Sequence, residues 1–317
     1  TPLALAAKNG HLEVVRLLLE NPETNLEKAG AFGRTVLGWA AKHGHEEVVK
    51  LLLQKGAAFN RCDDLGLTPL ALAAKKGHLA AVKALLTVDG IEVDSRDNDS
   101  NTPLLLAAKA GEKEVVETLL AMPNVDPDAK DNLDRTALKW ACRENYFDIA
   151  CMLLETGKAD VNSRDRFQGE YTPLHTAADR GNVKIVELLL AQPNILPDLP
   201  DIRANTPLLE AVWRGNAEIV KLLLSRKDVA PDKKGDMERT PFTLAASRGW
   251  EEIFKMFLAR APEEVDINAV DVSGQNALYH ACFNGSKEMV ELLLARPNID
   301  VNAQDNHGTT PLCIAAW

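Results

Sequence analysis

The 317-residue chain lacks several features that would assign it to a common class of protein. It has no apolar run near the ~18 residues that a membrane-spanning helix needs, and its start does not resemble a signal peptide. Its five cysteines include no Cys-x-x-Cys pair, and an odd number cannot all pair within the chain. We therefore expect an intracellular, cytoplasmic protein with reduced thiols and no contact with a membrane.

Clusters of residues that would carry out catalysis or hold a cofactor are also missing. The glycines are spread through the chain rather than gathered in a phosphate-binding loop, and no His or Cys residues have zinc spacing. We expect a protein that is not an enzyme, with no cofactor, metal or small-molecule substrate. One alternative is a thiol–imidazole pair of Cys313 and His280, but no third group that would orient it is evident.

Aromatic residues are scarce as well, and basic residues are outnumbered by acidic ones. The net charge is −10, which disfavours a general nucleic-acid binder, since such proteins show a basic balance. Aromatic residues make up 5% of the chain and apolar residues 46%, so small aliphatic side chains must build the core.

One short phrase recurs through the whole chain: Thr-Pro-Leu or a close relative, with an Ala at the fifth residue after the Thr. It begins at Thr1, Thr35, Thr68, Thr102, Thr136, Thr172, Thr206, Thr240, Asn276 and Thr310. A period of 33 to 36 residues indicates stacked repeats rather than one globular core. We expect a single solenoid over residues 1–317, with an incomplete repeat at each end.

Each unit predicts two short helices. The Thr is a good N-cap, and a Pro after it suits the first helical position. The first helix should end at a Gly such as Gly10, or at Asn145 in the fifth unit, because these residues favour the left-handed conformation. Polar joints such as residues 63–66 begin with Asp and end with Gly, which suits tight turns. The predicted fold is an all-α solenoid of helix–turn–helix repeats joined by short β-hairpin fingers.

These residues resemble the ankyrin repeat family. The resemblance rests on Asp-x-x-Gly-x-Thr-Pro-Leu, Ala-Ala-x-x-Gly-His and Val-Val-x-x-Leu-Leu-Leu, and it covers essentially the whole chain. The His that the family often carries after the Leu is present only as His175, and the joint at residues 296–302 is similar to those of long fungal ankyrin arrays. The resemblance implies a non-catalytic protein-binding scaffold.

In the ankyrin family the two residues after the Ala-Ala pair face a concave groove. In nine units of this chain those positions hold nine Lys or Arg residues and only two acidic ones, against the sign of the whole chain. Aromatic residues replace the polar ones at Trp213 and Phe283. Among the basic ones, the residues that we expect to bind a partner are Lys75, Lys76, Lys109, Arg143, Arg180, Arg214 and Arg248.

One finger is longer than the others. Asp165 lies seven residues ahead of Thr172 instead of the usual five, so the finger gains two residues. It carries three further candidate binding residues, Arg166, Phe167 and Tyr171. We expect the contact centre here, above Arg143, Arg180, Trp213 and Arg214. Two deeper aromatic residues, Trp39 and Trp140, are expected to pack inside the array.

The sequence thus predicts a non-catalytic scaffold that binds an acidic protein segment through its concave groove and fingers. A continuous stripe of one sign steers an oppositely charged partner, and interface hot spots are rich in Trp, Tyr and Arg. Two alternatives remain open. The array could be the sensor or autoinhibitory arm of a larger protein, or a single-stranded nucleic acid could stack on Trp213 and Phe283, which the acidic total disfavours.

Overall fold

In the computed structural model, every copy of the recurring phrase begins a helix whose N-cap is the first residue of the phrase. In each case the N-cap side chain accepts a backbone N–H from the first turn, as predicted. The structure describes residues 1–166 and 169–316, and the chain divides into two compact units, Thr1–Ser163 and Arg164–Trp317. The single solenoid over residues 1–317 depends on how these units join and stays a prediction.

The helices of the two units come in pairs. In the first unit they are α1 (Pro2–Lys8), α2 (Leu12–Leu18), α3 (Val36–Lys42), α4 (Glu46–Gln54), α5 (Pro69–Lys75), α6 (Leu79–Leu86), α7 (Pro103–Ala110), α8 (Lys113–Leu120), α9 (Ala137–Glu144) and α10 (Phe147–Glu155). In the second unit they are α11 (Pro173–Arg180), α12 (Val183–Leu190), α13 (Pro207–Arg214), α14 (Ala217–Leu224), α15 (Pro241–Arg248), α16 (Glu251–Leu258), α17 (Ala277–Phe283), α18 (Lys287–Leu294) and α19 (Pro311–Ala315). Single 3₁₀ turns, Ala31–Gly33 and Asp236–Glu238, precede α3 and α15.

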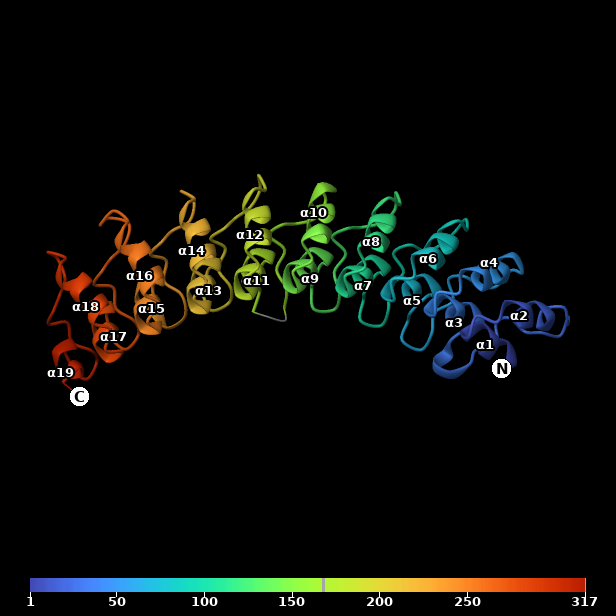
Figure 1. Cartoon of the computed structure of the whole chain (residues 1–317), viewed down its shortest axis with the longest axis horizontal. Coiled ribbons are helices and arrows are strands. Elements are labelled where there is room, and N and C mark those ends of the chain that lie inside the picture. Colours follow the sequence, from blue (N-terminus) through green and yellow to red (C-terminus); the bar gives the residue numbers. More distant parts are fainter. Residues whose placement is uncertain (167–168, 317) are drawn as a thin grey trace. The chain divides into compact units, whose positions relative to one another are not determined.

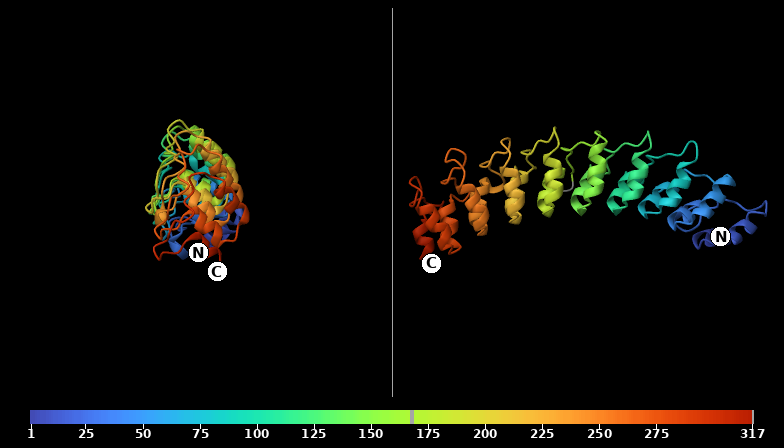
Figure 2. Two further views of the ribbon diagram at one scale, coloured as in Figure 1. Left: turned by 90° about the vertical axis from the view of Figure 1, so that its left-hand side faces the viewer. Right: turned by 45° about the horizontal axis from the view of Figure 1, so that its top comes forward.

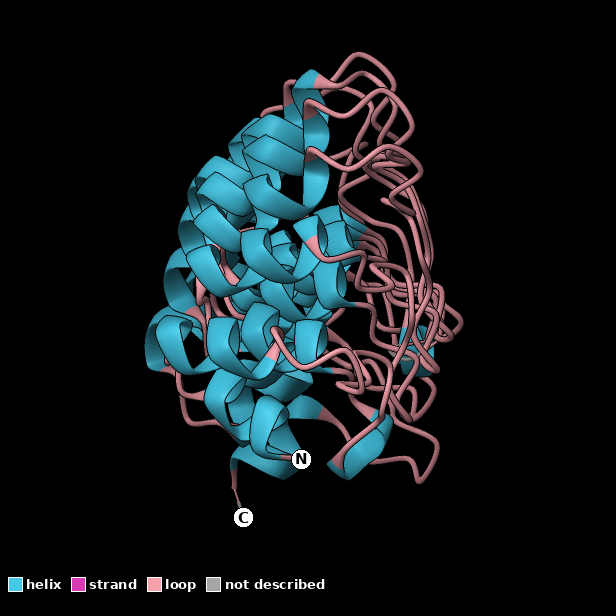
Figure 3. Cartoon of the chain, turned by 90° about the vertical axis from the view of Figure 1, so that its right-hand side faces the viewer, coloured by secondary structure: helices cyan, strands magenta, loops and turns pink. Residues whose placement is uncertain are grey.

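Within each unit the helices form two layers. The first helix of a repeat packs on the first helix of the next, as α3 does on α5 and α13 on α15 (Figure 1). The second helices do the same, as α4 on α6 and α12 on α14, so that successive pairs stand side by side (Figure 2). The joints between repeats project on one side of these layers (Figure 3). No helix in the described part of the chain has the length and apolar character of a membrane span.

The turn inside each pair follows the predicted chemistry. Gly111 ends α7 with a φ of 81°, and Asn145 ends α9 with a φ of 60°, both in the left-handed region. The Ala at the fifth residue after the Thr is buried in every repeat with a second helix in the described residues: Ala6, Ala40, Ala73, Ala107, Ala141, Ala177, Ala211, Ala245 and Ala281. Its carbonyl accepts the N–H of the residue before the second helix, as Ala245 does from Trp250 at 3.0 Å. A larger residue would separate the two helices.

The fingers are tight turns rather than paired strands, and the described residues contain no strand. Asp63 shows the pattern: its N–H bonds the carbonyl of Leu67 at 3.0 Å, and its Oδ1 accepts the N–H groups of Leu65 and Leu67. One backbone hydrogen bond of this kind closes each turn, and a single such bond does not form a β-ladder. In the lengthened finger the corresponding bond joins Asp165 N–H to Tyr171 O at 3.4 Å, so the two extra residues lie in the finger, as predicted.

A row of carboxylates and amides links neighbouring repeats at a second joint. Asp198 Oδ2 accepts the N–H of Ala230 at 2.8 Å, and Asp232 Oδ2 accepts that of Asp266 at 3.2 Å. One repeat further on the same position is Asn268. Its Oδ1 accepts an N–H from Asp300 at 2.8 Å, while its Nδ2 donates to the carbonyl of Asn298 at 2.7 Å.

The carboxylates make fewer bonds than the amide at this position. The second oxygens of Asp198 and Asp232 are buried and have no hydrogen-bond partner in the described residues. Burial raises the pKa of both carboxyl groups above the ordinary value of 3.8. An unpaired buried acceptor lowers the free energy of unfolding. Asp198 and Asp232 therefore destabilise the folded chain locally, whereas Asn268 does not.

We expect Asp232→Asn to raise the free energy of unfolding by about 1 kcal/mol at pH 7, because the amide keeps the acceptor and can add a donor. A folded-state pKa above the unfolded value means that wild-type stability falls as the pH rises above about 4. The gain of the variant should therefore be larger at pH 7 than at pH 4. Urea denaturation at the two pH values measures this.

The reverse change, Asn268→Asp, is the matched control in the same register. It removes the donor to Asn298 and should destabilise by a similar amount, about 1 kcal/mol. A lower stability of Asp232→Asn at pH 7 would contradict this account. It would mean that the second oxygen of Asp232 accepts a hydrogen bond, which an amide nitrogen in its place could not do.

Candidate functional site

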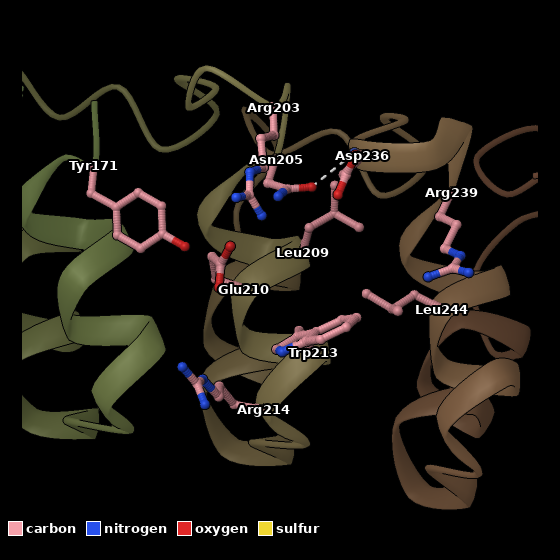
Figure 4. Close-up of a pocket in the computed structure, with 10 residues that line it drawn as sticks. All are labelled: Tyr171, Arg203, Asn205, Leu209, Glu210, Trp213, Arg214, Asp236, Arg239 and Leu244. Carbon is pink, nitrogen blue, oxygen red and sulfur yellow. Dashed lines mark hydrogen bonds between the residues drawn. The ribbon is translucent and has the colours of Figure 1, made fainter. Parts of the chain in front are cut away.

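Two adjoining cavities lie on the second unit and share a wall that includes residues of α13. The larger cavity, of about 780 Å³, lies between α11 and α13 and is lined by Arg166, Gly169, Tyr171, Asp179, Arg180, Asp201, Ile202, Arg203, Asn205, Glu210 and Arg214. The smaller cavity, of about 190 Å³, lies between α13 and α15 (Figure 4). It shares with the first Tyr171, Arg203, Asn205, Glu210 and Arg214, and adds Leu209, Trp213, Asp236, Arg239 and Leu244.

Arginines dominate the charge of the larger cavity, where four of them meet three acidic residues. Two of the acids are already engaged. Arg214 donates from two nitrogens to Asp179 Oδ1 at 2.8 and 2.5 Å, and Arg180 Nε lies 3.6 Å from Asp179 Oδ2. Asp201 accepts the N–H groups of Arg203 and Asn205, each at 2.8 Å. The acids therefore hold their own walls together rather than facing the open space.

Part of the positive charge stays free. Arg203 projects from the finger before α13 and is exposed, and its guanidinium has no hydrogen-bond or ion-pair partner in the described residues. Arg180, at the end of α11, keeps a side chain that is 42% exposed. The exposed guanidinium of Arg203 and the partly exposed one of Arg180 thus leave positive charge at the cavity in a chain of net charge −10.

Glu210 is the third acid, and it is buried. Figure 4 shows the hydroxyl of Tyr171 directed from its finger toward the carboxyl of Glu210 on α13. Burial raises the pKa of Glu210 above its ordinary value of 4.5, and it also raises the pKa of Tyr171, to which the hydrogen bond with Glu210 adds. The carboxyl thus sits on the shared wall of both cavities, where its charged form is disfavoured.

Sequence reasoning missed Glu210. A signal was present, because Glu210 is the only acid at the fourth residue after the opening Thr or Asn; the other units hold Leu5, Trp39, Leu72, Leu106, Trp140, Thr176, Leu244, His280 and Ile314 there. Asp236, Arg239 and Arg203 were missed too, since their approach to the cavities depends on how the fingers fold.

Trp213 gives the smaller cavity an apolar wall. The ring is 43% exposed, and Figure 4 shows it projecting from α13 toward Leu244 of α15. The guanidinium of Arg248 lies over this ring, 3.4 Å from its centroid. Of the predicted binding residues, the structure therefore brings Arg166, Tyr171, Arg180, Trp213 and Arg214 to the cavities, with Arg248 against Trp213.

The other predicted residues lie elsewhere. Lys75 and Lys76, at the end of α5, are exposed, and their ammonium groups have no partner in the described residues. Phe283 ends α17 and is 67% exposed. Phe167 lies outside the described residues. The predicted position of Arg143 below the long finger concerns both units and stays a prediction.

Lys109 and Arg143 are engaged within the first unit. Trp140 is 7% exposed, and three cations lie over its ring: Lys109 at 4.4 Å, Arg135 at 4.6 Å and Arg143 at 5.2 Å from the centroid. Burial and the neighbouring Arg135 lower the pKa of Lys109. Trp140 therefore packs inside the array, as expected.

The two residues of the possible thiol–imidazole pair have separate partners. His280 Nε2 lies 3.2 Å from Asp271 Oδ2, and burial lowers the pKa of this imidazole. The hydroxyl of Thr310 donates to Cys313 Sγ at 3.3 Å. No group of three His, Cys, Asp or Glu side chains in the described part of the chain is arranged to hold a metal ion.

Glu210→Gln should flatten the pH dependence of stability. Because the folded-state pKa of Glu210 is raised, wild-type stability falls as the pH rises above about 4.5, while a glutamine cannot ionise. We expect the variant to gain stability relative to wild type between pH 4.5 and 7.5, measured by thermal unfolding. The control is Glu187→Gln, an exposed carboxylate on α12. The same pH profile in both variants would contradict the assignment.

Comparisons with known proteins agree with this fold. The family model described as ankyrin repeats, in three copies, matches residues 3–97, 89–165, 158–235 and 227–305. A 50-residue segment is 40% identical to SMC5-SMC6 complex localization factor protein 1 of Homo sapiens, and it covers 16% of this chain and 5% of that protein. A 40-residue segment is 48% identical to osteoclast-stimulating factor 1 of Xenopus laevis, and it covers 13% of this chain and 19% of that protein.

The relatives and the family model carry different weight. The matched segments are a small part of the relatives' own length, so the activities of those proteins are not carried over to this chain. The family model, in contrast, extends over nearly the whole sequence. This chain belongs to the ankyrin repeat family.

Proposed function

We propose that this chain is a non-catalytic interaction module that binds an acidic segment of a partner protein through its groove and fingers, centred on the second unit. Ankyrin repeats generally mediate protein–protein interactions and are typically not catalytic. The observation that carries the proposal is the larger cavity, where four arginines converge although the chain as a whole carries −10.

The chemistry of the cavity walls supports a protein partner. Tyr171, Trp213 and Arg203 are of the three residue types most enriched in interface hot spots. The two types of wall suit a segment with both acidic and apolar side chains. Lys75 and Lys76 of the first unit are exposed and add positive charge that would steer an acidic segment at long range.

The test combines Arg180→Glu with Trp213→Ala. Partners are captured from a lysate of the source cell on the wild-type chain, identified by mass spectrometry and titrated against both proteins. We expect the double variant to bind at least tenfold more weakly, because it reverses one exposed charge of the larger cavity and removes the apolar wall of the smaller. Affinity for wild type should also fall as salt is added.

The matched control is Lys184→Glu, which makes the same reversal at an exposed lysine on α12. It should keep wild-type affinity. An unchanged affinity of the double variant, with its fold intact by circular dichroism, would contradict the proposal. Loss of the captured material on nuclease treatment would instead favour the nucleic-acid alternative.

A further inference from the structure

The two cavities differ in chemistry although they share a wall. The larger cavity presents Arg166, Arg180 and Arg203 from three separate elements: the long finger, the end of α11 and the finger before α13. The smaller cavity adds Leu209, Trp213 and Leu244, which belong to α13 and α15, together with Asp236 and Arg239, and Arg203 lines both cavities. Glu210 and Arg214 stand between them on α13.

We propose that the paired cavities recognise one acidic and one apolar side chain of the same extended segment, placed three residues apart. This inference rests on the proposed function and specifies what the partner must present. The acidic side chain enters the larger cavity, and the apolar side chain enters the smaller.

The acidic specificity follows from which charges are already used. Arg214 is held by Asp179, and Asp201 is held by backbone N–H groups, so neither offers much to a ligand. Arg203 has a free guanidinium, and Arg180 has only a 3.6 Å contact. A guanidinium matches a carboxylate with two parallel hydrogen bonds. A carboxylate at the mouth of the larger cavity would thus supply the hydrogen-bond acceptor that the guanidinium of Arg203 lacks in the described residues.

The apolar specificity follows from size and lining. The smaller cavity, at about 190 Å³, is below the roughly 300–1,000 Å³ of pockets that hold small-molecule ligands. It suits one side chain rather than a cofactor. Leu209 and Leu244 are buried behind it, and Trp213 closes one side with a ring that Arg248 holds in place. An aliphatic or aromatic side chain would cover the exposed face of this ring.

The spacing follows from helix packing. The wall that only the larger cavity has includes Arg180 of α11, and the wall that only the smaller cavity has includes Leu244 of α15, with α13 between them. The distinct parts of the two cavities are therefore about one helix separation apart, roughly 8–10 Å. A segment in the extended polyproline II conformation advances about 3.1 Å per residue and has three residues per turn, so residues three apart project on the same side, about 9 Å from each other. An acidic and an apolar residue three positions apart therefore reach both cavities, while residues one or six positions apart do not.

The experiment uses a displayed library of random 12-residue peptides, selected on the intact 317-residue chain. Counter-selection uses Arg203→Gln and Trp213→Ala. We expect the peptides that need both residues to be enriched in Asp or Glu three positions from Phe, Leu or Trp, in one consistent order. Selected peptides without that spacing would overturn the inference.

The best peptide is then synthesised and measured by fluorescence polarisation in two double-mutant cycles. Changing its acid to the amide should cost about tenfold on wild type and less than twofold on Arg203→Gln. Changing its apolar residue to Ala should show the same pattern against Trp213→Ala. Equal losses of affinity on wild type and variant would contradict the assigned contacts. Circular dichroism confirms that both variants fold.

Two control variants separate this inference from the proposed function. Lys76→Glu changes a free lysine on the first unit, and Phe283→Ala removes an exposed aromatic that lines neither cavity. Peptides that lose binding on these controls, but not on Arg203→Gln, would overturn the paired cavities and leave the interaction module standing. Acidic peptides that bind independently of every one of these residues would overturn both.

Discussion

The close contact of two helices at a buried alanine is the constraint on which the rest of the structure depends. In α13 this residue is Ala211, which is fully buried beside Val212. Residues three and four apart are neighbours on a helix, so Glu210, Trp213 and Arg214 lie together on α13. All three line the cavities. The buried position of the alanine therefore also fixes which positions of the helix remain available to contact a partner.

The same rule gives a different result in the first unit. In α9 the equivalent offsets are Trp140 and Arg143, and there the ring lies under cations from its own repeat and from Lys109 of the repeat before. The ring is almost wholly buried, so these cations contact the tryptophan and are less available to a partner. The same repeat architecture thus gives a surface at α9 whose cations pack on a tryptophan of the chain itself, and a cavity beside α13. The difference comes from the identity of two or three side chains.

Local rules predicted most of the fold. Thr caps, the left-handed Gly111 and Asn145, and the lengthened finger from Asp165 to Tyr171 depend on residues close in sequence, and the structure confirms them. The site was predicted less completely. Counting basic residues overstated the free charge, because Arg214 pairs with an acid 35 residues away. Such pairs form only after stacking, and no spacing rule shows them.

The buried Glu210 has a consequence for specificity. An acid beside several arginines weakens the attraction of the cavity for anions, which makes its place in the proposed site for an acidic side chain unexpected. It stands on the α13 wall, whereas Arg180 and Arg203 stand at the end of α11 and on the next finger. A carboxylate bound against α13 would meet Glu210, and one bound at the mouth would not. Repulsion of misplaced ligands is a source of selectivity. In the binding mode proposed above, Glu210 would confine an acidic side chain to one side of the larger cavity, and the apolar side chain that follows it would then cross α13 toward Trp213.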